Sequence, residues 1–338
     1  MSGQTKVLLV GMGNIGKCVL EMLPQFPDIQ LVGVVTRRPE EVNRSQVNVP
    51  VYQPGCFGEY LKCGADVAIM CGGSKYDLPK QTPFFAHYFN VVDSFDTHGH
   101  IGPYKEEETA QPMLGHLEMV NVVCRATCHT GHIGIGWDPG SFSKMRAIFK
   151  SCLGENCIVH AFYGLTEKGG LSMGHTNALK GIPGVEDARQ YTHANLDAIE
   201  KARRGTKFGL SDYEKHWREC KVVAAKCYDL KAIKDKIVSM PIYFAPFNTV
   251  VNFVTQAELD LEKADLSHDG LVVGCSNAGY MEFKNVWKSN PLGTAGFMLA
   301  YARATHRANQ AGRFGCFTIL DTADSELLLN PEERVGLI

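Results

Sequence analysis

Two aspartates, Asp96 and Asp138, are the residues of this chain that most clearly suggest chemistry. Each lies in a short segment near the expected end of a strand, VVDSFDTH at 91–98 and GWDPG at 136–140. A carboxylate stabilises a substrate ammonium by charge-assisted hydrogen bonding, and it can receive protons while a C–N bond is oxidised to an imine and hydrolysed. The pair therefore favours an amine substrate, with both aspartates as catalytic residues. Because a proline follows it, Asp138 is also suited to cap a helix.

A glycine-rich turn follows the first predicted strand. Residues 6–10 (KVLLV) are almost continuously apolar, as in a parallel strand buried on both faces, and they lead directly into GMGNIG at 11–16. The GxGxxG spacing permits a tight turn, close approach of the backbone to a pyrophosphate, and close packing of the helix that begins near residue 14. A second strand at residues 30–35 completes a βαβ unit. The predicted dinucleotide contacts of this turn are Gly11, Met12, Gly13, Asn14, Ile15 and Gly16.

The residues after the second strand indicate which dinucleotide binds. An NAD enzyme usually places Asp or Glu there to accept hydrogen bonds from the ribose hydroxyls, whereas this chain has Thr36, Arg37 and Arg38. Two adjacent arginines can bind the additional phosphate of NADP by charge-assisted contacts, and we expect no carboxylate there to repel it. The sequence therefore predicts NADP as the cofactor. The alternative is that both arginines are solvated in a loop.

Two more buried strands are predicted at residues 65–71 and 89–93. Ligands of a doubly wound sheet gather beyond the carboxyl ends of its strands, so the residues after these strands are expected to meet cofactor and substrate. The predicted cofactor contacts at these ends are Cys71, Gly72, Gly73, Ser74, Asp93, Ser94 and Phe95. A helix at 116–127 and a strand at 131–136 then lead to Asp138.

The pattern changes after residue 140 and predicts a second α/β domain with a mixed or mostly antiparallel sheet. Its predicted strands are 157–163, 221–225 and 250–255, and its predicted helices are 187–204 and 231–240. The glycine-rich residues 164–174 either cradle an anion through backbone N–H groups or form a plain loop. A helix at 294–310 and a strand at 316–320 are expected to return to the first domain.

The predicted fold class is α/β, with a Rossmann-type doubly wound parallel sheet and a second α/β domain. We assign residues 1–136 and 289–338 to the dinucleotide-binding domain, and residues 137–288 to a domain for substrate binding and dimerisation.

The bulk composition excludes several kinds of partner. The 338 residues are 45% hydrophobic and 21% charged, and 34 basic against 36 acidic residues give a formal charge of −2 without a block of like charge. Nucleic acid and membranes are therefore not expected as partners, and no apolar run approaches the ~20 residues that span a bilayer. Without an export signal, the chain is expected in the cytoplasm, with its twelve cysteines reduced.

We predict no metal site. The nearest candidate set is Cys124, Cys128, His129 and His132, whose ligand types suit zinc but whose spacing matches no familiar finger. A buried helix face for Cys124, followed by a turn that holds the histidines, explains the same residues without a metal.

Seven segments, read in order, resemble the meso-diaminopimelate D-dehydrogenase family, the NADP-dependent enzymes of lysine biosynthesis. They are GMGNIG at 11–16, TRR at 36–38, VDSFD at 92–96, GWDPG at 136–140, SMGHTNA at 172–178, IPGV at 182–185 and EKARRG at 200–205. The resemblance covers nearly the full length. It implies a homodimer that reversibly converts meso-2,6-diaminoheptanedioate, NADP and water into L-2-amino-6-oxoheptanedioate, ammonia and NADPH. The hydride leaves the D-configured carbon.

The resemblance also implies which residues contact the substrate. It places Asp96 and Asp138 at the ammonium groups, and it assigns further contacts to Trp137, Tyr163, Met173, Gly174, Thr192, Arg218, His268 and Asn290. A substrate with two carboxylates and two ammonium groups needs both cationic and anionic contacts, and an arginine suits bidentate binding of a carboxylate. Taken alone, Arg218 is equally typical of a solvated charged face, and Asn290 of a turn.

Several departures from the family pattern widen the expected substrate range. Tyr163 stands where tryptophan is common, Met173 replaces a frequent glutamine, and the segments 164–170 and 104–114 look longer than usual. Methionine donates no strong hydrogen bond, so other D-amino acids are alternative substrates of the same site. A saccharopine-reductase-like enzyme is a second alternative. An NADP-binding sensor, which needs no cleft for a diamine dicarboxylate, is a third.

Overall fold

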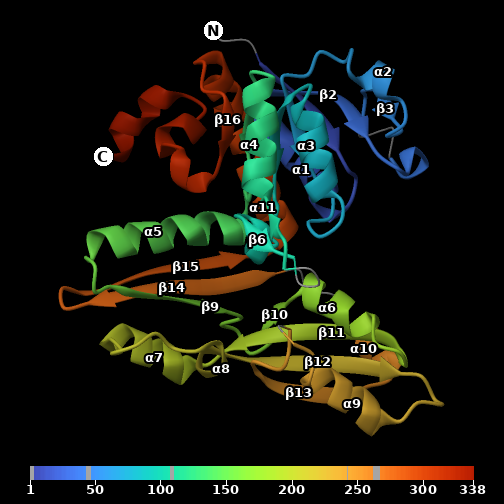
Figure 1. The fold of residues 1–338 in the computed structure, drawn as a ribbon, viewed down its shortest axis with the longest axis vertical. Coiled ribbons are helices and arrows are strands. Elements are labelled where there is room, and N and C mark those ends of the chain that lie inside the picture. The colour runs from blue at the N-terminus through green and yellow to red at the C-terminus, as the bar shows by residue number, and fades with distance from the viewer. Residues whose placement is uncertain (1–3, 43–46, 107–109, 242, 262–266) are drawn as a thin grey trace. The chain divides into compact units, whose positions relative to one another are not determined.

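The computed structural model describes residues 4–42, 47–106, 110–241, 243–261 and 267–338. The chain divides into two units (Figure 1). Unit 1 comprises Met1–Lys144 and Pro291–Ile338, and unit 2 comprises Met145–Asn290. The sequence places the domain boundaries after residues 136 and 288. In the structure the first unit continues to Lys144 and resumes at Pro291, so the turn at residues 137–141 belongs to unit 1.

Unit 1 is built on a seven-stranded parallel sheet, which confirms the predicted doubly wound fold. The strand order is β16-β8-β5-β4-β1-β2-β3, so the direction of winding reverses between β1 and β4, where such sheets bind their ligands. The strands are β1 (Thr5–Val10), β2 (Ile29–Val35), β3 (Val51–Tyr52), β4 (Val67–Met70), β5 (Asn90–Asp93), β8 (Thr130–His132) and β16 (Gly315–Phe317). Strand β8 ends earlier than predicted because Gly134 turns the backbone with a positive φ of 65°.

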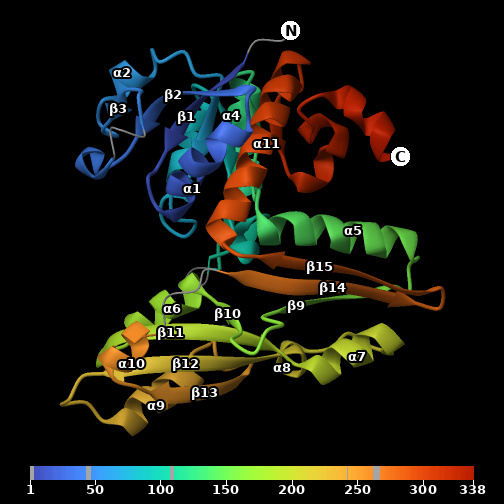
Figure 2. The same cartoon turned by 180° about the vertical axis from the view of Figure 1, so that it is seen from behind.

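Helices cover both faces of this sheet (Figures 1 and 2). Successive side chains of a strand point to opposite faces, so Val7 and Leu9 pack in the core with α1 and α11, whereas Leu8 and Val10 pack in the core with α3 and α4. The helices and the short hairpin of this unit are α1 (Asn14–Met22), α2 (Phe57–Tyr60), α3 (Leu78–Ala86), α4 (His116–Ala126), α11 (Asn290–Gln310), β6 (Tyr104–Lys105) and β7 (Pro112–Met113). Within the described ranges, no helix is both long and apolar enough to cross a membrane.

Unit 2 contains two sheets rather than the one we predicted. The first has the order β10-β11-β12-β13 and is mixed, because β12 and β13 run parallel, whereas the second has the order β15-β14-β9 and is antiparallel. The strands are β9 (Ile158–Tyr163), β10 (Gly170–Leu171), β11 (Val185–Ala194), β12 (His216–Ala224), β13 (Asn248–Phe253), β14 (His268–Ser276) and β15 (Gly279–Trp287). The helices are α6 (Met173–Lys180), α7 (Leu196–Arg204), α8 (Asp212–Lys215), α9 (Leu230–Val238) and α10 (Gln256–Leu261), and α5 (Phe142–Cys152) connects the two units.

The predicted helix at 187–204 is wrong in its first half. Residues 185–194 form strand β11, and the helix begins only at Leu196, after Asn195 caps it with a side-chain hydrogen bond to the backbone N–H of Asp197. Strand β11 is hydrogen-bonded along its length to β12, and this pairing overrides the local helical pattern. The hairpin of β14 and β15 also escaped prediction.

A buried carboxylate, that of Asp93, ties together the loops at the ends of β5 and β8. It accepts hydrogen bonds from Thr82 Oγ1 at 2.8 Å and from the backbone N–H groups of Phe95 at 3.0 Å and Gly134 at 3.2 Å. It also pairs with His116 Nε2 at 2.7 Å, and the His116 ring stacks on Phe95. Because these two loops carry the predicted catalytic aspartates, the carboxylate fixes the backbone that presents them.

His132 joins β8 to the C-terminal part of unit 1. Its Nδ1 lies 2.8 Å from Thr305 Oγ1 in α11, and its Nε2 lies 2.8 Å from Thr322 Oγ1. Burial lowers the pKa of His132 to about 3, and the positive charge of Arg313 acts in the same direction. The folded protein therefore holds this imidazole neutral at physiological pH.

We predict that Asp93→Ala lowers the free energy of unfolding by about 3–5 kcal/mol, because it leaves two buried N–H groups, a hydroxyl and an imidazole without their acceptor. Urea unfolding monitored by circular dichroism measures this loss. Asp66→Ala is the matched control, since among the described residues the Asp66 side chain accepts one hydrogen bond, from the backbone N–H of Lys6, and its loss should cost only about 1 kcal/mol. Equal losses in the two variants would contradict the proposed role of the network.

We also predict a pH dependence of stability that His132 carries. The pKa of His132 is lower in the folded state than the ordinary value of 6.5, so below that pH the unfolded chain binds a proton that the folded chain does not. Stability is therefore lost as pH falls, by about 1 kcal/mol from this residue between pH 7 and pH 5.5. In His132→Gln, the free energy of unfolding should therefore fall by about 1 kcal/mol less than in the parent protein between pH 7 and pH 5.5. Urea unfolding at the two pH values measures this difference. His98→Gln, which removes an exposed histidine, is the control.

Candidate active site

The glycine turn after β1 has the geometry of a phosphate cradle. Gly11 has a positive φ of 101° and lies against the backbone of Cys71, and a Cβ on Gly16 would lie 2.1 Å from the carbonyl oxygen of Gly11. A Cβ on Gly13, by contrast, would meet no atom within 4 Å. Gly13 is the N-cap residue of α1, and among the described residues no side-chain hydrogen bond caps that helix. Open space beside Gly13 and uncapped N–H groups fit a bound pyrophosphate.

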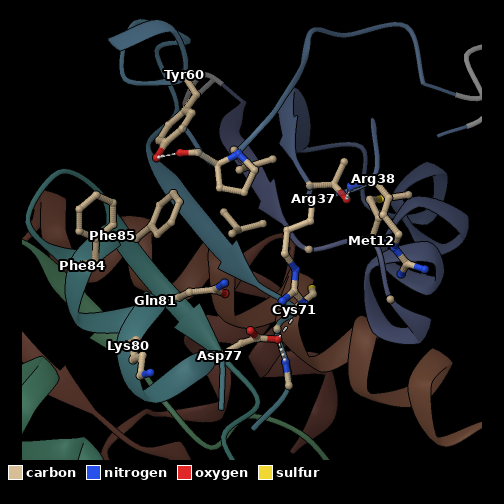
Figure 3. A pocket seen from close by; sticks show the side chains of 18 residues that line it. Met12, Arg37, Arg38, Tyr60, Cys71, Asp77, Lys80, Gln81, Phe84 and Phe85 are labelled. Atoms are coloured by element: carbon tan, nitrogen blue, oxygen red, sulfur yellow. Dashed lines mark hydrogen bonds and ion pairs between the residues drawn. The ribbon is translucent and has the colours of Figure 1, made fainter. Parts of the chain in front are cut away.

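A cavity of about 380 Å³ lies beside this turn (Figure 3). The predicted cofactor residues that line it are Gly11, Met12, Gly13, Thr36, Arg37, Arg38, Cys71, Gly72 and Gly73. The predicted cofactor residues outside its lining are Asn14, Ile15, Gly16, Ser74, Asp93, Ser94 and Phe95. The side chain of Asp93 is fully buried and bound by protein groups, which gives it a structural role, and its contact with the cofactor stays a prediction.

One side of the cavity comes from residues that we did not predict. Asp77, Lys80, Gln81 and Phe84 reach it from α3 and the residue before that helix, and further lining residues are Val10, Val35, Pro54, Tyr60 and Phe85. Positions 77, 80, 81 and 84 are three and four residues apart, so they share one face of the helix. In the sequence, this helical spacing directly after the glycines at the end of β4 could have predicted that these residues line the cofactor site.

The expectation that no carboxylate lies near the arginine pair is wrong. Arg37 Nη2 lies 3.2 Å from Asp77 Oδ2, and Arg38 Nη1 lies 3.1 Å from Glu41 Oε2. Asp77 follows Arg37 by 40 residues, so folding alone brings the two together. The Arg37 side chain is 73% exposed, so water screens its attraction to Asp77, and the pair contributes little to stability.

Asp96 lies exposed in the loop after β5, and Ser74 holds its backbone. The N–H of Asp96 donates to Ser74 Oγ at 2.8 Å, and the same hydroxyl lies 3.4 Å from Thr97 Oγ1. Ser74 therefore connects the loop after β4 to the loop after β5. In this structure the predicted cofactor residue Ser74 positions the backbone of a predicted catalytic residue.

Asp138 lies in the turn Trp137–Ser141 that precedes α5 and has extended backbone angles. Gly136 precedes the turn and α5 begins at Phe142, so Asp138 stands within the turn and not directly before α5. A Cβ built on Gly134 would lie 3.5 Å from the carbonyl oxygen of Phe95 and 3.4 Å from the Pro139 ring. The loops that carry Asp96 and Asp138 thus meet around Gly134.

In unit 2, the predicted substrate residues Thr192 and Arg218 face each other on β11 and β12. Arg218 is only 9% exposed, its Nη1 donates to Thr192 Oγ1, and its guanidinium lies 4.0 Å above the Phe247 ring. Burial lowers the pKa of Arg218 to about 10, so it stays charged at neutral pH. No carboxylate of the described residues forms an ion pair with it, and its Nε has no hydrogen-bond partner.

Tyr163 lies close to the arginine. Its backbone N–H donates to His216 Nε2 at 3.0 Å, and its ring stacks on that imidazole. Burial and the nearby Arg218 lower the pKa of His216 to about 3, so the imidazole is neutral and can accept this bond. The following loop packs on β11 and β14, and the N–H groups of Gly164 and Leu165 donate to Asp269. Because these N–H groups already donate to protein acceptors, residues 164–174 fit a plain loop better than a backbone cradle for an anion.

The remaining predicted substrate residues of unit 2 lie at element ends. Gly174 is exposed in the first turn of α6, His268 begins β14, and Asn290 begins α11. Met173 begins α6, but its side chain lies outside the described part of the structure. Burial and the nearby Arg218 lower the pKa of His175, in the first turn of α6, to about 4, and its ring lies against Ser172 Oγ.

The candidate zinc ligands serve other purposes. Cys124 is buried in α4, and burial raises the pKa of its thiol to about 12. The Nδ1 of His129 lies 3.0 Å from the carbonyl oxygen of Ala86 and 2.9 Å from Thr127 Oγ1, and His132 lies between two threonines. Among the residues that the structure describes, no three His, Cys, Asp or Glu side chains are grouped as metal ligands.

Three kinds of similarity relate this chain to known proteins. Residues 136–288 match the family model described as diaminopimelic acid dehydrogenase C-terminal domain. The meso-diaminopimelate D-dehydrogenase of Lysinibacillus sphaericus is 37% identical over 337 residues, which cover 98% of this chain and 97% of that protein. The Corynebacterium glutamicum DAP dehydrogenase in complex with DAP is 33% identical, with a TM-score of 0.86 over 99% of each chain. An engineered D-amino acid dehydrogenase bound to NADP+ is 32% identical, with a TM-score of 0.81 over 98% of this chain and 99% of the other. The chain therefore belongs to the meso-diaminopimelate D-dehydrogenase family.

Proposed function

We propose that this chain catalyses the reversible, NADP-dependent oxidative deamination of meso-2,6-diaminopimelate at its D centre, giving L-2-amino-6-oxopimelate and ammonia. The observation that carries the proposal is Arg218, a buried and charged guanidinium without a carboxylate partner among the described residues, in a chain similar over nearly its full length to this family. Burying an unpaired cation is costly, so a site for an anionic ligand accounts for its retention. A substrate carboxylate is such a ligand.

The cofactor site is the cavity beside the glycine turn. When bound, NADP supplies the hydride acceptor. The uncapped N-terminus of α1 and the open space at Gly13 suit its pyrophosphate, and Arg37 and Arg38 suit its additional phosphate. Lys80 adds a third cation to the lining.

Asp96 and Asp138 bind the ammonium group at the reacting centre in this proposal. Asp96 is exposed and its loop is held by Ser74, so its carboxylate is available to a ligand. A carboxylate that accepts hydrogen bonds from the ammonium orients the carbon and can hold the protons released as the imine forms and is hydrolysed. Either residue could hold that proton, and the variants below separate them.

Arg218 orients the substrate from the non-reacting end. Thr192 and Phe247 fix its guanidinium, which leaves its fork of donors for a carboxylate. Holding the L centre at a fixed position selects the D centre for reaction, since only one end of the molecule then reaches the hydride acceptor.

We further propose a homodimer in the cytoplasm. Strand β15 is an edge strand that exposes Tyr280, Met281 and Val286, which suits a second copy of the chain. The twelve cysteines are all free thiols, which is typical of a reducing compartment. Sedimentation velocity measures the oligomeric state.

The deciding experiment follows NADPH absorbance after purified protein is mixed with meso-diaminopimelate and either NADP or NAD. We expect turnover with NADP and meso-diaminopimelate, weaker turnover of D-alanine and D-lysine, and no turnover of the LL isomer, which has no D centre. Asp96→Asn should lower kcat about a hundredfold, because it removes one of the two carboxylates that bind the ammonium and can hold its protons, while the Kd for NADP stays unchanged. The same measurements on Asp138→Asn show which of the two carboxylates contributes more to kcat. Ordinary activity in Asp96→Asn would remove that residue from the site, and preference for D-alanine would favour a D-amino acid dehydrogenase.

Arg218→Met should raise the KM for meso-diaminopimelate about a hundredfold, because it removes charge-assisted hydrogen bonds to a carboxylate. Methionine fills much of the same volume, so the core of unit 2 should remain folded. Arg313→Met is the matched control, since that arginine pairs with Glu326 on unit 1. An unchanged KM in Arg218→Met would show that the arginine does not bind substrate.

A further inference from the structure

Asp77 is the one carboxylate among the described residues that line the cofactor cavity. Its Oδ2 accepts hydrogen bonds from Arg37 Nη2 at 3.2 Å and from the backbone N–H of Gly73 at 3.0 Å (Figure 3). Proteins also use arginine guanidinium groups and the backbone N–H groups of glycines to bind phosphate. The carboxylate therefore occupies donors that suit an anionic ligand.

Helix capping does not explain this carboxylate. Asp77 stands at the N-cap position of α3, but its backbone is helical, with φ −89° and ψ −56°, and its side chain makes no capping hydrogen bond. Instead it reaches back to the loop after β4. The side chain is 23% exposed, so it remains accessible from the cavity.

We propose that Asp77 is a specificity-determining residue that competes with the cofactor for Arg37. The inference rests on the proposed NADP site. A nucleotide that carries the additional phosphate must displace the Asp77 carboxylate from Arg37 or share the guanidinium with it. A nucleotide with a free ribose hydroxyl has no such requirement. Asp77 therefore reduces the preference for NADP over NAD below the value that Arg37 and Arg38 would otherwise give.

The test compares the Kd values of NADP+ and NAD+ for the parent protein and for Asp77→Asn, by isothermal titration calorimetry. Asparagine keeps an oxygen that accepts from the Gly73 N–H and removes only the charge. We expect NADP+ to bind about two- to fivefold more tightly and NAD+ to be unaffected, the range of an exposed charge pair. The gain should shrink at high salt.

Two further variants make the test specific. In an Arg37→Gln background, Asp77→Asn should no longer change the ratio of the two Kd values. Glu41→Gln is the matched control, because it removes the carboxylate that pairs with Arg38 but lies outside the cavity lining, and its effect on the ratio should be smaller.

Three outcomes would overturn the inference and leave the proposed function standing. In the first, Asp77→Asn weakens the binding of NADP+ and NAD+ equally, which would indicate a ribose contact or a role in organising the loop. In the second, Asp77→Asn still tightens NADP+ binding in the Arg37→Gln background. In the third, Glu41→Gln tightens NADP+ binding as much as Asp77→Asn does. A parent protein that binds no NADP+ would overturn both the inference and the proposed cofactor.

Discussion

The Asp93 carboxylate, buried in the interior of unit 1, is the constraint on which the geometry of that unit's candidate site depends. Four groups, from two helices and two loops, donate to it or pair with it, and two of them, the N–H groups of Phe95 and Gly134, belong to the loops that present Asp96 and Asp138. A buried carboxylate needs such partners because its desolvation is otherwise costly. The same requirement fixes the backbone that carries the exposed carboxylate of Asp96 and the half-buried carboxylate of Asp138.

Unit 2 presents the opposite electrostatic condition. Asp93 is a buried anion whose hydrogen bonds come from the protein, whereas Arg218 is a buried cation with a hydroxyl, an aromatic face and an Nε without a partner. Satisfied buried charges organise a fold, and an incompletely satisfied one is a candidate binding group. From this contrast we propose a structural role for Asp93 and a ligand-binding role for Arg218.

The cofactor cavity shows how a site can be shaped by a residue distant in sequence. Arg37 and Arg38 follow β2, as an NADP site requires, yet each pairs with a carboxylate of the protein. Both contacts are exposed and contribute little to stability, and in our proposal the Asp77 contact alone competes with the nucleotide for its arginine. Selectivity between two nucleotides that differ by one phosphate is a difference of small free energies, to which one exposed carboxylate can contribute measurably.

The sequence by itself determined the parallel sheet, the glycine turn and the residues at strand ends, because buried strands and GxGxxG spacing are local patterns. Membership of the family followed from short segments such as GWDPG. Only the tertiary structure decided that residues 187–194 form a strand, since β12 supplies their hydrogen-bond partners. It likewise placed Asp77 beside Arg37 and gave Asp93 a structural role. Those outcomes depend on contacts between residues far apart in the chain, and no periodicity along the sequence encodes them.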